Sequence, residues 1–400
     1  MVLSREQELL DAIYASPDDD APRQVYADAL TEIGDRRGEF ITLQLARTRG
    51  PADPAQLFME RALSEDPERR VAWGRPLSNA GLCHFSRGFP DELHLEGNRF
   101  DELLHEPAVS LLQRIYGLDR GIPDESARKL LQQPSAARLT TVSGLSATLV
   151  RSLDAPLEWP SVGIHFDRSE DQSRQLRKVR TLELLPSGIR VPAGALEGLV
   201  KLEKLTLGSA LPGVIRQLTG LVHLNATHRL SGPMWSTELA GLSRLKRLEL
   251  GEAISGRELD GLGLRSLRCG TSSQLDVDRL LGGLSRLNEL EFSCSTLPLM
   301  LQTVAKVLAA KRVTQLQVVS VANFRFINLG RADATLELLL FPSFSSEEVT
   351  QVIEQIPRSA VGSVVVRPIL DDPWYRIGPP PQWLEALRAV AKMPVELAWY

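Results

Sequence analysis

Leucine recurs through the centre of this chain in a short pattern, L-x-x-L-x-L, that alternates apolar and polar positions. The clearest copies cover residues 202–207, 221–226 and 245–250, and weaker copies cover residues 264–269 and 287–292. In each copy the second and third apolar residues are two positions apart, so in a strand they point to one face and their neighbours to the other. The pattern therefore predicts a series of short strands, each with an apolar face and a polar face.

The spacing of these strands predicts the architecture. When the middle apolar residue of each copy is taken as a marker, successive markers are 19 to 26 residues apart. Units of about 20 to 29 residues are typical of leucine-rich repeats, in which each unit supplies one strand and one helix or turn. We expect an α/β leucine-rich-repeat solenoid, with a curved sheet of about a dozen parallel strands and helices or turns on its convex side. The markers are Leu182, Leu205, Leu224, Leu248, Leu267, Leu290 and Leu316.

Weaker units extend the pattern at both ends of the chain. On the N-terminal side, apolar residues alternate near residues 89–95, 114–118, 138–142 and 161–166, and helical patterns lie between them. On the C-terminal side, strands are expected around Leu336, Leu338 and Leu340, at residues 361–366 and at residues 395–399, with helices at residues 304–310, 347–356 and 381–392. The solenoid is therefore predicted to cover residues 81–400, with degenerate units at both ends.

Residues 1–80 show a helical period instead. Ser4 and Gln7 form a capping-box signature, and apolar residues then recur three and four positions apart as far as Trp73. We expect helices at about residues 4–15, 22–33, 35–49 and 55–73. They predict an all-helical domain that caps the first coil of the solenoid, because an uncapped coil would expose its apolar interior to water.

Several short motifs in this helical segment also occur together in a known family. They are D-D-D-A-P-R at residues 18–23, Y-A-D-A-L at 26–30 and G-D-R-R-G-E-F-I-T-L-Q at 34–44, followed by W-G-R-P-L at 73–77 and R-G-F at 87–89. In this order they resemble the bacterial repeat-companion domain, an N-terminal module that accompanies leucine-rich repeats. The resemblance implies a helical cap followed by repeats, and it implies no established chemistry.

The charged residues of these motifs have two interpretations. Arg23, Asp28, Asp35, Arg37 and Glu39 could form a ligand site. The interpretation that we favour is that they are helix caps and ion pairs that fix the helices against one another.

Composition narrows the class of protein. The chain of 400 residues has a formal net charge of −4, so it has no basic bias that would attract nucleic acid or anionic lipid. Its three cysteines are odd in number and form no C-x-x-C pair, which favours a reducing, cytoplasmic setting. The charged N-terminus and the lack of any apolar run of about 18 residues predict neither export nor a membrane span.

Motifs for catalysis are missing from the sequence. It contains no phosphate-binding loop, no dinucleotide-binding G-x-G-x-x-G after a strand, no H-E-x-x-H and no G-x-S-x-G. His223 and His228 are five positions apart at the end of a strand, without a neighbouring cysteine or paired carboxylate, so a metal site there is not expected. We therefore predict a protein that is not an enzyme and that needs no cofactor and no metal.

The polar face of the strands is the remaining candidate for function. A stacked array of strands offers an extended concave surface that suits a partner of protein size, and the mixed charge of this face favours a protein over a polyanion. The alternative for any single residue is that it is merely solvated. The predicted partner-binding residues are His94, Glu183, Lys204, Thr206, His223, Asn225, Arg247, Glu249, Arg268, Glu289, Glu291, Gln317 and Glu337.

Two functions fit such a surface. The first is a cytoplasmic scaffold or regulator that grips another protein. The second is an inhibitory or recognition subunit, resembling an immunity protein, that occludes the active site of a partner enzyme or toxin. A third and weaker hypothesis places an enzyme in the N-terminal helices.

Overall fold

The computed structural model describes most of the first half of the chain and separate segments of the second half. The chain divides into two compact units, Met1–Ile189 and Arg190–Tyr400. The predicted domain boundary at residue 80 lies inside the first unit and stays a prediction. The described residues are 2–50, 54–95, 100–117, 121–154, 156–165, 173–185, 191, 196–207, 213–226, 235–251, 259, 261–269, 281–293, 306–307, 313–319, 323–327, 335–340, 363–368 and 395–397.

The first unit begins with helices that pack around two apolar clusters, the smaller one formed by Phe40, Leu63 and Trp73. Tyr26, Ile41 and Leu45 are buried in the larger cluster together with Phe89 from a following strand. The single helix predicted over residues 55–73 is in fact two, because Pro67 starts a new helix whose first backbone N–H groups bond to the side chain of Asp66. The helices are α1 (Val2–Ala15), α2 (Ala21–Glu32), α3 (Arg36–Arg49), α4 (Pro54–Ser64) and α5 (Pro67–Gly74), followed by the 3₁₀ turn η1 (Leu77–Asn79).

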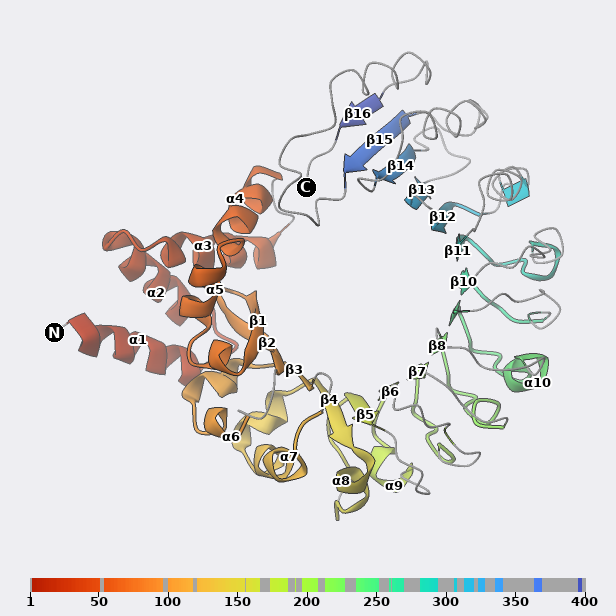
Figure 1. The fold of residues 1–400 in the computed structure, drawn as a ribbon, viewed down its shortest axis with the longest axis horizontal. Helices are drawn as coiled ribbons and strands as arrows, with labels where there is room; N and C mark the ends of the chain where they lie inside the picture. Colours follow the sequence, from red (N-terminus) through yellow and green to blue (C-terminus); the bar gives the residue numbers. More distant parts are fainter. Residues whose placement is uncertain are drawn as a thin grey trace. The chain divides into compact units, whose positions relative to one another are not determined.

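The strands of the first unit follow one another in sequence order (Figure 1). They are β1 (Gly81–Ser86), β2 (Phe89–Leu95), β3 (Arg114–Gly117), β4 (Thr141–Ser146), β5 (Ser161–His165) and β6 (Thr181–Leu185). All neighbours from β2 to β6 are parallel. The connections contain α6 (Phe100–Leu103), η2 (Pro107–Leu111), α7 (Asp124–Leu131), η3 (Pro134–Arg138), α8 (Ala147–Arg151) and α9 (Ser173–Leu176).

The pairing of β1 with β2 is antiparallel, which the sequence did not predict. The tight turn is made by Arg87 and Gly88, which both have positive φ, at 53° and 81°. Positive φ at both central residues is the geometry of the turns that match the twist of a two-stranded hairpin. Gly88 also lies against Ile41 of α3, where a Cβ atom would be only 2.2 Å from the Ile41 Cγ1. The turn therefore fixes the hairpin against the helices.

The second unit contains the parallel strands that the leucine pattern predicted. They are β7 (Lys204–Leu207), β8 (His223–Ala226), β9 (Arg247–Leu250), β10 (Ser266–Cys269), β11 (Glu289–Ser293) and β12 (Gln315–Val319), with α10 (Trp235–Leu239) between β8 and β9. The marker leucines of adjacent strands lie directly opposite one another, as Leu224 does with Leu205 and Leu248. All six marker leucines of these strands are buried. Their apolar side chains form the core face of this sheet.

The C-terminal strands depart from the predicted parallel arrangement. β13 (Asn323–Ile327) was not predicted, and it is antiparallel to both β12 and β14 (Thr335–Leu340). The pairs of β14 with β15 (Ser363–Pro368) and of β15 with β16 (Val395–Leu397) are parallel. The helices predicted at residues 347–356 and 381–392 lie outside the described residues. The architecture is thus α/β with a mostly parallel sheet, and the expectation of parallel strands throughout was wrong at β1–β2, β12–β13 and β13–β14.

Candidate functional site

The candidate site is the polar side of strands β7 to β12, which we call the polar face. Because the strands are parallel and in register, equivalent residues of successive strands stack into two rows. The first row is Lys204, His223, Arg247, Ser266, Glu289 and Gln315, and the second row is Thr206, Asn225, Glu249, Arg268, Glu291 and Gln317. The structure therefore brings together the predicted site residues from Lys204 to Gln317.

Glu249 lies at the centre of the polar face and is only 6% exposed. Its Oε1 accepts a hydrogen bond from the Nε of Arg247 at 2.8 Å and lies 2.9 Å from the Nε2 of His223. Since an ionised carboxylate only accepts hydrogen bonds, Nε2 of His223 carries the hydrogen. The bond from His223 is the largest cause of a pKa of about 2 for Glu249, and Arg247 lowers the pKa further against the opposing effect of burial. Glu249 is therefore a fixed negative charge.

Charges alternate along the second row beyond Glu249. The Nε of Arg268 lies 3.0 Å from the Oε1 of Glu291, and its Nη1 lies 3.8 Å from the Oε2 of Glu249. The side chains of Arg247 and Arg268 are still 52% and 49% exposed. Part of each guanidinium group is therefore accessible to a partner. The paired carboxylates of Glu249 and Glu291 hold these two arginines in position.

A depression of about 190 Å³ lies over the end of the polar face near β10 to β12. Both acidic and basic side chains line it, so it suits a partner surface that also carries both charges. The polar residues that line it are Arg247, Ser266, Arg268, Glu289, Glu291, Gln315 and Gln317.

Three predicted site residues lie elsewhere. His94 and Glu183 are in the first unit, where His94 is opposite Tyr116 on β3 and Glu183 is opposite Gly163 on β5. Glu337 lies on β14, opposite Arg325 of the unpredicted strand β13. Arg325 also lies opposite Gln317, so it continues the second row and was missed. The alternation of Phe324 and Phe326 around it is the signal that could have identified this strand.

The charged residues of the N-terminal motifs hold the helices and the hairpin together. Asp35 caps α3 by accepting a bond from the backbone N–H of Arg37 at 2.8 Å. Arg23 is 2% exposed and donates to the carbonyls of Pro17 and Asp19, each at 2.8 Å, and burial lowers its pKa to about 10. The guanidinium carbon of Arg37 lies 5.0 Å from the ring centroid of Phe89. These contacts favour a structural role over a ligand site.

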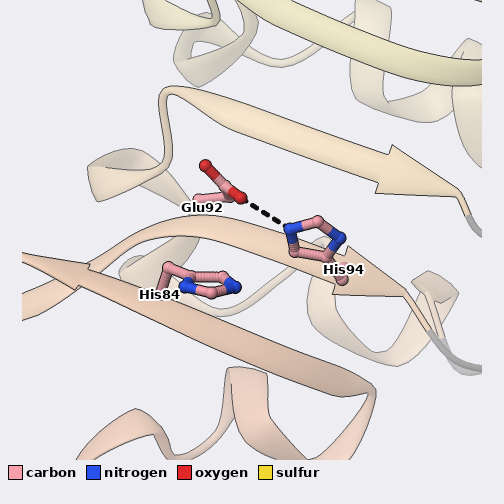
Figure 2. Close-up of side chains that lie close together, drawn as sticks. All are labelled: His84, Glu92 and His94. Carbon is pink, nitrogen blue, oxygen red and sulfur yellow. Dashed lines mark hydrogen bonds and ion pairs between the residues drawn. The ribbon is translucent and has the colours of Figure 1, made fainter. Parts of the chain in front are cut away.

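The sequence contains a pair of neighbouring histidines, His223 and His228, at which no metal site was expected. His228 lies outside the described residues, and His223 is bonded to Glu249 of the next strand. Among the described residues, a different group has the spacing of metal ligands: His84, Glu92 and His94 of the β1–β2 hairpin (Figure 2). The sequence signal for this group was a histidine and a Glu-x-His pair on the two sides of the Arg87–Gly88 turn.

No protein-family model matches the chain, and no curated protein is significantly similar to it. The resemblance of the N-terminal motifs to the repeat-companion domain therefore stays a prediction. Within the described part of the chain, none of the helices combines the length and the apolar character needed to cross a membrane.

Proposed function

We propose that this chain is a non-enzymatic leucine-rich-repeat protein that binds a protein partner through the polar face. The observation that carries this proposal is the register of β7 to β12, which stacks charged side chains of both signs into two rows on one side of the sheet. Buried leucines occupy the other side. The polar face is thus a rigid array whose side chains are positioned by the strands beneath them.

The size of the polar face suits a protein better than a small molecule. Six strands that lie about 4.8 Å apart give a surface about 24 Å across. A stable interface buries about 800 Å² on each partner, which is a patch roughly 28 Å across. The dimension of the polar face across its strands is therefore close to the width of such a patch, and surface beside these short strands would supply the rest of the area.

The rest of the proposal concerns the whole chain. We propose that residues 1–80 form a helical cap, as the resemblance to the repeat-companion domain implies, and that residues 81–400 form the solenoid. The proposal is supported by the helices α1 to α5, which all precede the first strand. A cytoplasmic location is supported by Cys83, which is buried and free. The balance of acidic and basic groups on the polar face supports a protein partner and no nucleic acid.

Matched substitutions on and off the polar face test the proposal. Lys204→Glu changes an exposed charge in the first row, and Ser266→Trp adds bulk to a half-buried position of the same row. With the full chain as bait in extract from its native host at modest salt, we expect each change to weaken capture of the partner at least about 10-fold, because repulsion or a clash replaces a contact.

The controls are Lys201→Glu and Ser243→Trp, which make the same changes at exposed positions outside the strands. They should leave capture unchanged, and all four variants should unfold at the denaturant concentration of the unchanged chain within error. Equal capture by Lys204→Glu, Ser266→Trp and their controls would contradict the proposal. The captured protein also separates the two candidate functions, because one stoichiometric enzyme indicates an inhibitor and several assembly components indicate a scaffold.

A further inference from the structure

We propose that His84, Glu92 and His94 form a binding site for a divalent transition-metal cation of the Zn²⁺ class. The site lies in the first unit, so it is independent of the partner-binding function proposed for the second. His84 and His94 are imidazole ligands and Glu92 is a carboxylate ligand, which together make a set of donors that Zn²⁺ and similar cations use. Their ligand atoms all lie within 4.8 Å of one another.

The hairpin explains why these residues meet. In the antiparallel pairing of β1 with β2, His84 lies directly opposite Glu92. His94 follows Glu92 by two positions, so both side chains leave β2 on the same face. Figure 2 shows the three side chains gathered on one side of the hairpin, with the imidazoles of His84 and His94 beside each other. Two adjacent strands joined by a tight turn therefore position all three ligands.

The distances are close to those of a bound cation. Zn–N and Zn–O bonds of about 2.0 to 2.1 Å place tetrahedral ligand atoms about 3.4 Å apart. The Nε2 of His94 and the Oε1 of Glu92 are already 2.5 Å apart, sharing a hydrogen that a cation would replace. The imidazole of His84 has its ring centroid 5.1 Å from that of His94, and its side chain is exposed. Cation binding would therefore require the exposed His84 side chain to rotate and the His94 and Glu92 atoms to move apart by about 0.9 Å, to the separation of a tetrahedral site.

Neighbouring side chains orient two of the ligands. The Nε of Arg114 lies 2.9 Å from the Oε2 of Glu92, which leaves Oε1 directed at His94. The ring of Tyr116 stacks on His94, with centroids 4.7 Å apart and planes at 16°. These contacts limit the orientations that the two ligands can adopt.

The local charge also favours a cation. Arg114 is positive, but it lies 2.9 Å from a carboxylate oxygen of both Asp91 and Glu92, so these three groups sum to one negative charge. The histidines are neutral when they bind a metal. The net attraction is modest at a partly exposed site, so the nitrogen ligands must supply most of the affinity. Mg²⁺ and Ca²⁺ prefer oxygen ligands and should bind poorly.

Titration of the untagged full chain with Co²⁺ and Zn²⁺ tests the site. Co²⁺ bound to two imidazoles and a carboxylate gives visible absorption bands, and Zn²⁺ binding is measured by calorimetry. We expect one equivalent to bind, with Zn²⁺ displacing Co²⁺ and millimolar Mg²⁺ displacing neither. His84→Ala, His94→Ala and Glu92→Gln should each weaken binding at least about 100-fold, because the loss of an outer partner alone costs 10-fold to 100-fold.

The matched control is His105→Ala, which removes an exposed histidine just beyond α6 and should leave the affinity unchanged. Circular dichroism of each variant without metal verifies the fold. If His84→Ala does not fold, His84→Gln replaces it in the titration, because this position is exposed. Failure of the unchanged chain to bind Co²⁺ or Zn²⁺ overturns the proposal. Unweakened binding in the folded His84 and His94 variants overturns it as well, because the metal would then be bound elsewhere.

Discussion

Glu249 retains its charge although its side chain is only 8% exposed. Burial alone would raise the pKa of a carboxyl group, but His223 and Arg247 both stabilise the ionised form. The charged form is therefore part of what holds β8 and β9 in their relative positions. Removing this charge should destabilise the fold, in contrast to changes at the exposed residues of the polar face.

We predict that Glu249→Gln lowers the free energy of unfolding in a way that depends on pH. The folded pKa of about 2 is below the ordinary value of 4.5, so the stabilisation is fully present above about pH 4.5 and is lost as the pH falls through about 2. The shift corresponds to a loss on the order of 3 kcal/mol in the variant at pH 7. Urea unfolding of both proteins at pH 7, 4 and 3 measures it.

The control for this prediction is Glu203→Gln at an exposed position before β7, which should change the stability by less than about 0.5 kcal/mol. A difference between Glu249→Gln and the unchanged chain that is as large at pH 3 as at pH 7 would show that the charge is not the source of stability.

Gln44 is a second buried polar residue that connects distant parts of the chain. It is 3% exposed, its Oε1 accepts a hydrogen bond from the backbone N–H of Gly88 at 2.7 Å, and its Nε2 donates to Glu60 at 2.9 Å.

We predict that Gln44→Ala lowers the free energy of unfolding by about 2 to 4 kcal/mol, because two buried partners lose a hydrogen bond. Thermal and urea unfolding measure it. Gln7→Ala, at an exposed position of α1, should cost no more than about 0.5 kcal/mol, and equal losses in the two variants would refute the role of Gln44.

At the scale of elements, α10 is tied to the segment before β8 by one side chain. The carboxylate of Glu238 is buried and accepts bonds from the backbone N–H of Gly213 and, at 3.1 Å, from that of Ile215. These N–H groups lie in a turn, so the side chain supplies acceptors that a regular helix or strand would have provided. These two hydrogen bonds join the β7–β8 connection to the β8–β9 connection.

We predict that Glu238→Ala destabilises the chain by about 1 to 3 kcal/mol, since two backbone N–H groups lose a charged acceptor. Hydrogen exchange at the amides of Gly213 and Ile215 should become faster than in the unchanged chain. Glu197→Ala, at an exposed position, is the control and should leave both amides as protected as before. Unchanged exchange in Glu238→Ala would mean that these amides are protected in another way.

The sequence predicts elements better than it predicts pairings. The strands β7 to β12 and their two faces follow from alternation alone, because a shift of one residue would turn every leucine to the solvent. The direction of β1 depends on a turn instead. The positive φ angles of Arg87 and Gly88 reverse the chain, and this dipeptide gives little local signal. For the same reason, the meeting of His84 with Glu92 was not predicted.

The candidate site was also predicted only in part. The alternation of apolar and polar residues correctly predicted that Glu249, Arg247 and His223 lie on one face of the sheet. It gave no indication that Glu249 is buried, because the groups that cover and ionise it come from β8 and β10 as well as from its own strand. Burial of a polar residue depends on the length and direction of side chains on neighbouring strands, which a pattern of apolar positions does not contain.

At the scale of the molecule, the two compact units carry different proposed roles. The first contains the helices, the hairpin and the proposed metal site, and the second contains the polar face. The hairpin and the polar face belong to different units and share no described contact, so substitutions in the hairpin should not change the polar face. Loss of metal binding and loss of partner binding are thus expected in separate sets of variants.

The most direct test of the central claim is site-specific crosslinking to the captured partner. A photoreactive amino acid is placed at Gln315, an exposed residue in the first row of the polar face, and at Lys246, an exposed residue just before β9. The proposal predicts a covalent adduct with the partner from position 315 and none from position 246. Adducts from position 246 alone would contradict the claim that the polar face is the binding surface.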